Sequence, residues 1–243
     1  MNLKSTCLST AAAFAGVAIS TAAPVPLQQA TATHSQSGFS VDFLIDGVLA
    51  PGNATGVGWA LDKDLTTSAE TAVFETVTDL TSAGGFNLTF SIFQGGFGNH
   101  SLGKFRLSYT TDARTLFADD VDSSGDVTAN WITLTPSGAL SDNPNTTFTF
   151  PGSDMILAQG GPDVDDLETQ TITASTGALV APITGFRLEA LADAALPDSG
   201  PGRSNNGNIV LRELSVDAGA VPEPASFGLL ALGAGALLLP RRR

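Results

Sequence analysis

The sequence is poor in the residues that carry most enzyme chemistry. It contains one cysteine, Cys7, and two histidines, His34 and His100, in 243 residues. A single cysteine excludes an intramolecular disulfide and a cysteine-based metal cluster. Histidine is the usual acid or base near neutral pH, and two of them leave few options for a catalytic centre. We also find no nucleophile-elbow, metalloprotease or nucleotide-binding motif in a suitable context. We therefore predict no catalytic residues.

Basic side chains are scarce as well. Lysine and arginine total 11, against 24 aspartates and glutamates, which gives a formal net charge of −13 at pH 7. Such a chain repels a phosphate backbone, so we predict that nucleic acid is not a partner. The same charge suits a solvated surface and favours cations over anions as ligands.

No apolar run is long enough for a permanent membrane span. The N-terminal one covers residues 11–19, follows Lys4 and precedes small residues up to Ala23. This order is typical of a secretory signal peptide, which we place at residues 1–23. It predicts secretion across the inner membrane.

A second apolar run, residues 227–239, lies near the C-terminus. As a helix it would extend about 20 Å, against a hydrocarbon core of about 30 Å. Glycines within it weaken the helix further. The arginines that follow would stay on the cytoplasmic side. This short apolar helix predicts transient insertion into the inner membrane, and an ordinary weak tail anchor is the alternative.

The last residues, VPEPASFGLLALGAGALLLPRRR, resemble the PEP-CTERM sorting signal of Gram-negative bacteria. The resemblance covers residues 221–243 and rests on Pro222, Glu223, Pro224, Arg241, Arg242 and Arg243. It implies processing by an exosortase, a membrane transpeptidase. It also implies delivery to the cell surface or to an extracellular biofilm matrix rich in polysaccharide. Such a signal is an address and identifies no activity.

Between the two signals, apolar and polar residues alternate with a period of two, as in half-buried β-strands. Turn-forming residues separate the runs. We expect an all-β chain with strands at Phe86–Ile92, Phe105–Tyr109, Thr147–Phe150, Phe39–Ile45, Ala72–Val77, Trp131–Thr135, Thr169–Thr173, Ile183–Glu189 and Asn208–Val216.

A short phrase recurs after about eighty residues. Gly103-Lys104-Phe105-Arg106-Leu107 returns as Gly185-Phe186-Arg187-Leu188, with Phe and Leu on the expected core face and Arg on the solvent face. This spacing predicts two tandem jelly-roll β-sandwich modules at residues 31–112 and 128–217, joined by an acidic linker at residues 113–127. One larger β-sandwich is the alternative.

The two blocks resemble galactose-binding-like, discoidin-type jelly rolls. The resemblance rests on phrases such as Gly58-Trp59-Ala60-Leu61-Asp62 and Leu102–Ser108, and in the second block on the stretch from Leu196 to Leu214. The second block also resembles modules of large bacterial haem proteins, but the haem-attachment phrase CxxCH is absent. The resemblance implies carbohydrate-binding modules.

Two acidic turns are candidate calcium sites. In the predicted linker, oxygen-bearing side chains alternate at Asp120, Asp122, Ser124 and Asp126, with a glycine among them. This is how a calcium loop begins, although Trp131 stands where an EF-hand has its glutamate. A solvated linker is the alternative. The second candidate is Asp46, because the discoidin-type resemblance implies a structural Ca²⁺ at this early Asp-Gly turn; a plain turn is the alternative.

For the ligand we single out the loop Pro197–Asn208, with Arg203 and Asn206 as the residues that contact it. We expect a non-catalytic surface or matrix protein that binds extracellular polysaccharide. A purely structural matrix protein without a ligand and a secreted polysaccharide hydrolase are the alternatives.

Overall fold

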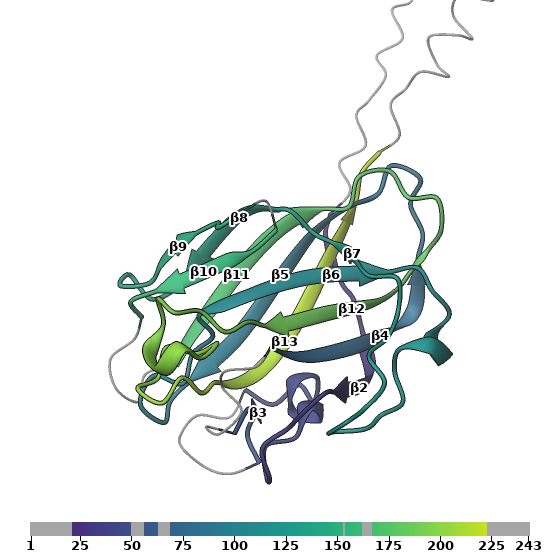
Figure 1. The fold of residues 1–243 in the computed structure, drawn as a ribbon. Helices are drawn as coiled ribbons and strands as arrows, with labels where there is room; N and C mark the ends of the chain where they lie inside the picture. Colours follow the sequence, from purple (N-terminus) through teal and green to yellow (C-terminus); the bar gives the residue numbers. More distant parts are fainter. Residues whose placement is uncertain (1–20, 50–55, 63–68, 153, 162–166, 223–243) are drawn as a thin grey trace, which may run out of the picture.

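A computed structural model describes residues 21–49, 56–62, 69–152, 154–161 and 167–222. These residues form two antiparallel β-sheets packed face to face as a sandwich (Figure 1). Within the described ranges, helical structure is limited to short 3-10 turns. The predicted all-β class is therefore confirmed. Both predicted terminal helices lie almost wholly outside the described residues.

The first sheet has six strands. Its strands are, in sheet order, β1 (Ala23–Pro24), β13 (Val210–Ala220), β5 (Phe86–Gly95), β11 (Leu167–Ser175) and β8 (Pro136–Ser141), and β3 (Trp59–Ala60) pairs with β13. The second sheet has seven: β2 (Leu27–Ala32), β4 (Glu70–Leu80), β12 (Ile183–Ala190), β6 (Lys104–Thr110), β10 (Ile156–Gln159) and β9 (Thr147–Thr149), and β7 (Ile132–Thr133) pairs with β6.

From β4 onward the chain alternates between the two sheets, apart from the short strands β7 and β9, which pair with β6 and β10 of the same sheet. The chain passes from β4 to β5, β6, β8, β10, β11, β12 and β13, and it changes sheet at every step. Each sheet thus combines strands from both halves of the chain; β5, for example, pairs with β11 and β13. Residues 31–112 and 128–217 do not form separate modules. The strand pairing instead gives the alternative, one larger β-sandwich.

The predicted linker is packed on the sandwich. The Asp120 amide donates to Thr31 Oγ1 at 2.9 Å, and the Gly125 amide donates to the Ala32 carbonyl at 3.0 Å. These bonds continue the edge of β2, which is the last strand of its sheet among the residues that the structure describes. An acidic, turn-rich composition therefore marked a loop that closes a sheet edge, not a boundary between domains.

The repeated Phe-Arg-Leu phrase has a different origin from the one expected. Its two copies lie in the adjacent strands β6 and β12, where Leu107 pairs with Leu188. The expected facing is confirmed, since Phe105, Leu107, Phe186 and Leu188 are buried while both arginines point outward to Glu189. The similarity reflects two neighbouring strands that face the same core.

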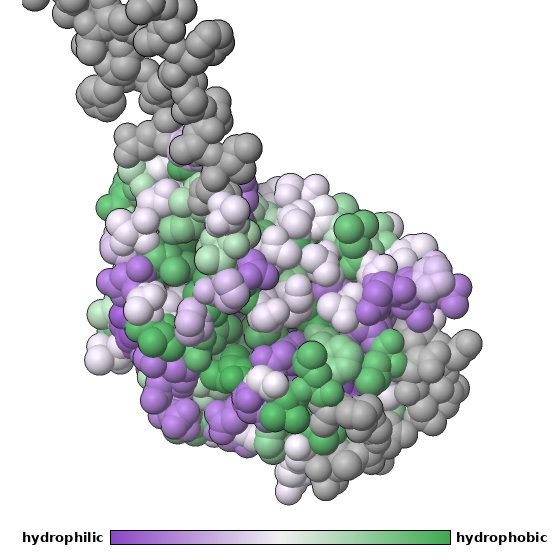
Figure 2. All heavy atoms as spheres, turned by 180° about the vertical axis from the view of Figure 1, so that it is seen from behind, coloured by the Kyte–Doolittle hydropathy of each residue, from purple (hydrophilic) through white to green (hydrophobic). Residues whose placement is uncertain are grey.

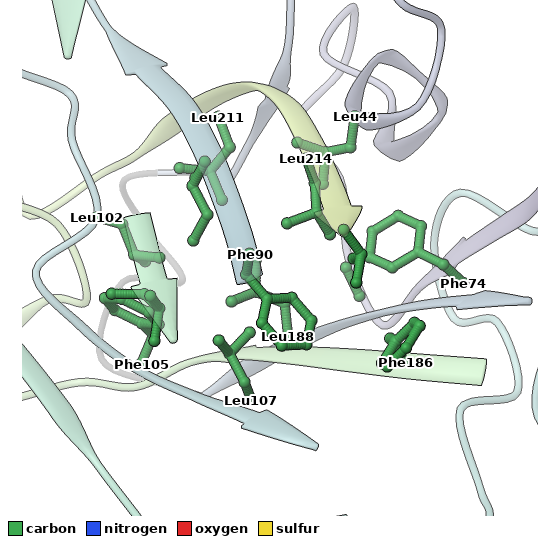
Figure 3. Close-up of a cluster of buried hydrophobic side chains, with 14 of the residues drawn as sticks. Leu44, Phe74, Phe90, Leu102, Phe105, Leu107, Phe186, Leu188, Leu211 and Leu214 are labelled. Carbon is green, nitrogen blue, oxygen red and sulfur yellow. The ribbon is translucent and has the colours of Figure 1, made fainter. Parts of the chain in front are cut away.

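The core lies between the sheets and is formed by the inward positions of each strand. In β5, Phe86, Leu88, Phe90 and Ile92 are buried at every second position, as the period predicts. Phe90 meets Phe186 of the other sheet edge to face, with ring centroids 5.5 Å apart. Figure 3 shows Leu, Phe and other apolar side chains from both sheets pointing toward one another.

One expected strand is wrong. Residues 39–45 contain the 3-10 turn η1 (Val41–Leu44), which begins after Ser40. The Ser40 side chain accepts a hydrogen bond from the Asp42 amide, as a helix cap does. Val41 and Leu44 are both buried and stand three positions apart. That spacing fits one turn of helix and not the two-residue period of a strand.

The two ends of the described chain lie at the same pole of the sandwich. Ala23 pairs with Ala218, and the Val221 amide donates to the Gly85 carbonyl. The opposite pole carries the loops before β13 and after β5, together with those around η1 and η4 (Pro197–Ser199). In Figure 1 the loop with η4 lies at the lower left and η1 lies at the bottom, both away from the end of β13.

Candidate functional site

The loop after β5 has an unusual backbone. Five successive residues have positive φ angles: Gly95, Gly96, Phe97, Gly98 and Asn99, at 102°, 79°, 52°, 82° and 62°. Glycine adopts this region freely, but a bulky aromatic residue does so at a cost of about 1 kcal/mol or more. The sequence Gly-Gly-Phe-Gly-Asn thus holds Phe97 in a strained backbone conformation. Such outliers concentrate at functional sites.

Phe97 contributes to a pocket at the loop pole, which we call the loop pocket. It measures about 230 Å³ and is lined by Gln36, Phe39, Phe97, His100, Asn208 and Val210.

Aromatic rings form one wall of the loop pocket. Phe39 and Phe97 meet edge to face with centroids 5.8 Å apart, and Phe97 and His100 do so at 6.2 Å. The guanidinium of Arg212 lies 5.7 Å from the Phe97 ring centroid. These contacts hold the Phe97 side chain in place, as its backbone does.

Amide side chains and backbone bonds fix the other wall. Asn208 donates from Nδ2 to Gln36 Oε1 at 3.0 Å. The loops behind them are joined by backbone hydrogen bonds, with the Val210 amide donating to the His100 carbonyl at 2.7 Å and the Arg203 amide to the Ser101 carbonyl at 2.8 Å. The pocket is therefore built on loops that are tied to one another, which favours preorganised binding.

Buried polar atoms without a partner gather near this pole. Among the residues that the structure describes, nine such side-chain atoms occur, and five belong to His34, Ser35, Asn99, His100 and Ser101. Buried polar groups are normally paired, so such a concentration points to water or a ligand as the missing partner. Burial lowers the pKa of His100, and the Phe97 backbone partly offsets this shift. The imidazole is thus neutral at pH 7.

The lining residues indicate which chemistry the pocket suits. They offer two amides, a neutral imidazole and aromatic faces, and none of them is an acid, lysine or arginine. Such a wall matches an uncharged ligand with hydroxyl groups on an apolar skeleton. It supplies no pair of carboxyl groups for acid–base hydrolysis.

The structure places the two predicted ligand residues behind the pocket. Arg203 is buried and donates to Glu168, to Thr146 Oγ1 at 3.0 Å and to the Gly160 carbonyl at 3.2 Å. Its guanidinium is enclosed by protein groups, so it supports the loop. Asn206 Oδ1 accepts from Ser204 Oγ and from the Asn208 amide, which shapes the turn. The residue of this loop that reaches the pocket is Asn208.

Sequence reasoning missed Phe97, Phe39, Gln36 and His100. The signal for Phe97 was present, because three glycines and an asparagine surround one aromatic residue and indicate a left-handed backbone. Nothing in the sequence brings residues 36–39 and 97–100 together, since that contact depends on the long-range pairing of β3 with β13.

The predicted calcium loop uses several of its oxygens internally. Asp122 Oδ1 accepts from the Val41 amide at 2.8 Å, and Asp126 Oδ1 accepts from the Thr128 amide at 2.9 Å. Asp120 contributes its backbone amide to Thr31, and Ser124 its amide to the Thr33 carbonyl. In the described part of the chain, no group of three or more His, Cys, Asp or Glu side chains is placed to hold a metal ion. The calcium site stays a prediction.

Asp46 lies beside Glu213 of β13. The amide of Gly47 donates to Glu213 Oε2 at 3.1 Å, and both acids line the hollow of about 310 Å³. Burial raises the pKa of Glu213 to about 7, with the Asp46 carboxylate adding to the shift and the Gly47 amide opposing it. Outside the loop pocket, the carboxyl group of Glu213 is the strongest candidate for a functional titratable group.

The sorting motif and the signal peptide lie largely beyond the described residues. Pro222 is the last described residue and is exposed, whereas Glu223, Pro224 and the three terminal arginines fall outside. Across the described ranges, no helix has the length and apolar character needed to cross a membrane.

Comparisons with known proteins add little. No protein-family model matches the chain, and no curated protein matches it in sequence. Among solved structures, a chain from a study of the multiple functions of the Streptococcus pneumoniae β-galactosidase BgaA is similar, with a TM-score of 0.49 and 11% identity. The match covers 81% of this chain and 98% of that chain. At these values it supports no transfer of function.

Proposed function

We propose that this chain is a non-catalytic binding protein for an uncharged polysaccharide and that the loop pocket is its binding site. The observation that carries the proposal is the strained run Gly95–Asn99, which fixes Phe97 in the wall of a pocket that also has the amide side chains of Gln36 and Asn208. An aromatic face beside a few polar hydrogen-bonding groups suits a sugar ring, which has both apolar and hydroxyl surfaces. The net charge of −13 makes a neutral polymer an easier partner than an acidic one.

We further propose that the protein is exported and processed by an exosortase, as the sequence of its two ends indicates. An exported protein of this kind would meet polysaccharide at the cell surface or in the matrix. This part of the proposal rests on residues 1–23 and 221–243 alone.

One observation favours a second candidate, a secreted polysaccharide hydrolase. Glu213 has a pKa of about 7 and lies next to a second acid, Asp46. A carboxyl group that keeps its proton near neutral pH is what a glycosidase uses as its general acid. A Glu213→Gln variant that loses measurable polysaccharide cleavage would support this candidate.

A screen of the full chain against immobilised glucans, galactans and mannans tests the main proposal, with alginate as the anionic comparison. We expect retention on at least one neutral polymer without release of reducing ends. The Gln36→Ala variant removes the acceptor of the Asn208 amide and should weaken retention. Phe150→Ala, which removes an exposed ring elsewhere, is the control.

Each outcome has a clear meaning. Retention that Gln36→Ala reduces and Phe150→Ala leaves unchanged supports the loop pocket. Retention that neither variant changes places the site elsewhere. Absence of retention on every polymer favours the structural matrix protein.

A further inference from the structure

The outer faces of the two sheets differ. On the seven-stranded sheet, the loop before β7 covers the outward side chains: the Trp131 ring lies 5.2 Å from the Arg187 guanidinium, and Phe117 packs beside it. On the six-stranded sheet, the outward positions of β5, β11 and β13 carry mostly short polar side chains. Figure 2, seen from behind the view of Figure 1, shows hydrophilic and hydrophobic residues interspersed over this side.

Strand pairing arranges these outward side chains in rows. Ser215 of β13 pairs with Ser91 of β5, which pairs with Thr171 of β11. Residues of one row stand about 4.8 Å apart, and successive rows about 7 Å apart. The rows are Glu213–Phe93–Thr169, Ser215–Ser91–Thr171 and Asp217–Thr89–Thr173. The sheet therefore presents hydroxyl groups on a rigid support.

A hollow of about 150 Å³ lies over the first two rows. We call it the sheet groove, and it is lined by Leu49, Ser91, Phe93, Thr169, Glu213 and Ser215. Glu213 and Ser215 also line the hollow of about 310 Å³ that contains Asp46. The two hollows thus share these two lining residues.

The groove combines hydroxyl groups with an apolar wall. Leu49 is 62% exposed, although an apolar side chain gains by being covered. None of the lining residues is basic, which disfavours anionic polymers. With a pKa of about 7, Glu213 is partly protonated at neutral pH and can donate as well as accept. An uncharged, hydroxyl-rich ligand fits this set of groups.

A second copy of the chain fits less well. Two copies packed through this face would bring Glu213 and Asp217 of one molecule toward the same acids of the other, and each molecule carries a net charge of −13. Like charges placed opposite one another oppose association.

The sheet groove is close to the loop pocket. Val210 lines the pocket and Glu213 lines the groove, and they are three residues apart on β13, which corresponds to about 10 Å. A ligand of a few sugar units is long enough to contact both.

We propose that the sheet groove is a second binding site, which takes the continuation of an uncharged polysaccharide held in the loop pocket. The proposal rests on the proposed function of the loop pocket. Two linked contacts raise the affinity for a long ligand above that for a short one, because the second contact forms at a high effective concentration.

The test compares oligomers of different length. Oligomers of two and six units, prepared from whichever neutral polymer retains the protein, are titrated into wild type, Phe93→Ala and Leu140→Ala. Leu140 is 72% exposed on the same sheet face but outside the groove, so it serves as the control. Wild type should bind the longer oligomer at least about tenfold more tightly. Phe93→Ala should lose this gain and keep its affinity for the shorter one.

The remaining outcomes separate this inference from the proposed function. Equal affinities for the two lengths, or a gain that survives Phe93→Ala, would overturn the second site and leave the loop pocket standing. Absence of retention on every neutral polymer in the screen overturns both proposals. A dimer in solution that Phe93→Ala dissociates would show that the groove is a contact between copies. Melting curves verify that each variant is folded.

Discussion

Arg203 and Glu168 form an ion pair in the interior of the sandwich, where 3% and 0% of their side chains are exposed. The pair joins the loop before β13 to the start of β11. Glu168 also accepts from Ser141 and Thr146, so its carboxylate is well satisfied. Arg203 therefore holds the loop that carries Asn208 and does not face the ligand.

Breaking this pair should strongly destabilise the protein. Arg203→Met leaves the Glu168 carboxylate buried without its partner, which we expect to lower the free energy of unfolding by about 3 to 5 kcal/mol. Urea denaturation measures the change. Asp79→Asn, which removes the 51% exposed partner of Arg114, should lower it by less than about 1 kcal/mol. Equal effects of the two variants would contradict the role assigned to Arg203.

Two glycines at the opposite pole offer a matched comparison. Gly85 and Gly177 both have positive φ, but a Cβ on Gly85 would overlap the Gly177 carbonyl oxygen, whereas a Cβ on Gly177 meets nothing within 4 Å. Gly177→Ala should cost about 1 to 2 kcal/mol from the backbone alone. Gly85→Ala should cost about 2 kcal/mol more, because the two turns must separate. Denaturation midpoints that do not differ would show that the turns are not in contact.

Glu213 should make stability depend on pH. Its folded pKa of about 7 exceeds the ordinary value of 4.5, so the folded state holds its proton more tightly than the unfolded state. Ionisation of Glu213 thus leaves the free energy of unfolding unchanged below pH 4.5. It lowers this free energy as the pH rises toward 7, and the loss persists at higher pH. Glu213→Gln should stabilise the protein at pH 8 by about 1 to 2 kcal/mol, allowing for partial exposure.

At pH 4 the same variant should have no such effect. Asp46→Asn should give a smaller gain at pH 8, since it removes only the electrostatic part of the shift. Thermal melting at both pH values measures these differences. A gain of the same size at pH 4 and pH 8 would mean that ionisation of Glu213 is not its cause.

Calcium binding by the acidic loop can be tested by melting. Asp120 and Asp122 both act electrostatically on Asp42, although burial is the larger cause of the raised pKa of that group. A cation would relieve this repulsion and stabilise the folded state in proportion to its affinity. The melting temperature with millimolar calcium should exceed that with a chelator. Identical temperatures would support a plain loop.

The sequence predicted local features better than long-range ones. Alternation in Phe86–Ile92 identified a strand and its buried face, because the two-residue period is a local property. Ile183–Glu189 was also identified as a strand, but nearly all of its residues are buried. Alternation could not identify partners, since β4 pairs with β12 more than a hundred residues away. The division into two modules was wrong for this reason.

The same limit applies to the candidate site. The loop Pro197–Asn208 was singled out by its composition, yet composition does not show which of its side chains point inward. Arg203 turned toward Glu168 of a distant strand, and Asn208 turned toward Gln36 near the N-terminus. The positive φ of Phe97 was implied by its glycine neighbours, but its aromatic partner Phe39 became known only from the fold.

The most direct test of the central claim is affinity electrophoresis of the full chain in gels that contain the neutral polysaccharide selected by the screen, comparing wild type with Phe97→Ala. The loop pocket loses its main aromatic wall in this variant, while the sheets keep their pairing. We predict that polysaccharide retards wild type and that Phe97→Ala migrates as it does in a gel without polysaccharide. Equal retardation of the two folded proteins would contradict the account.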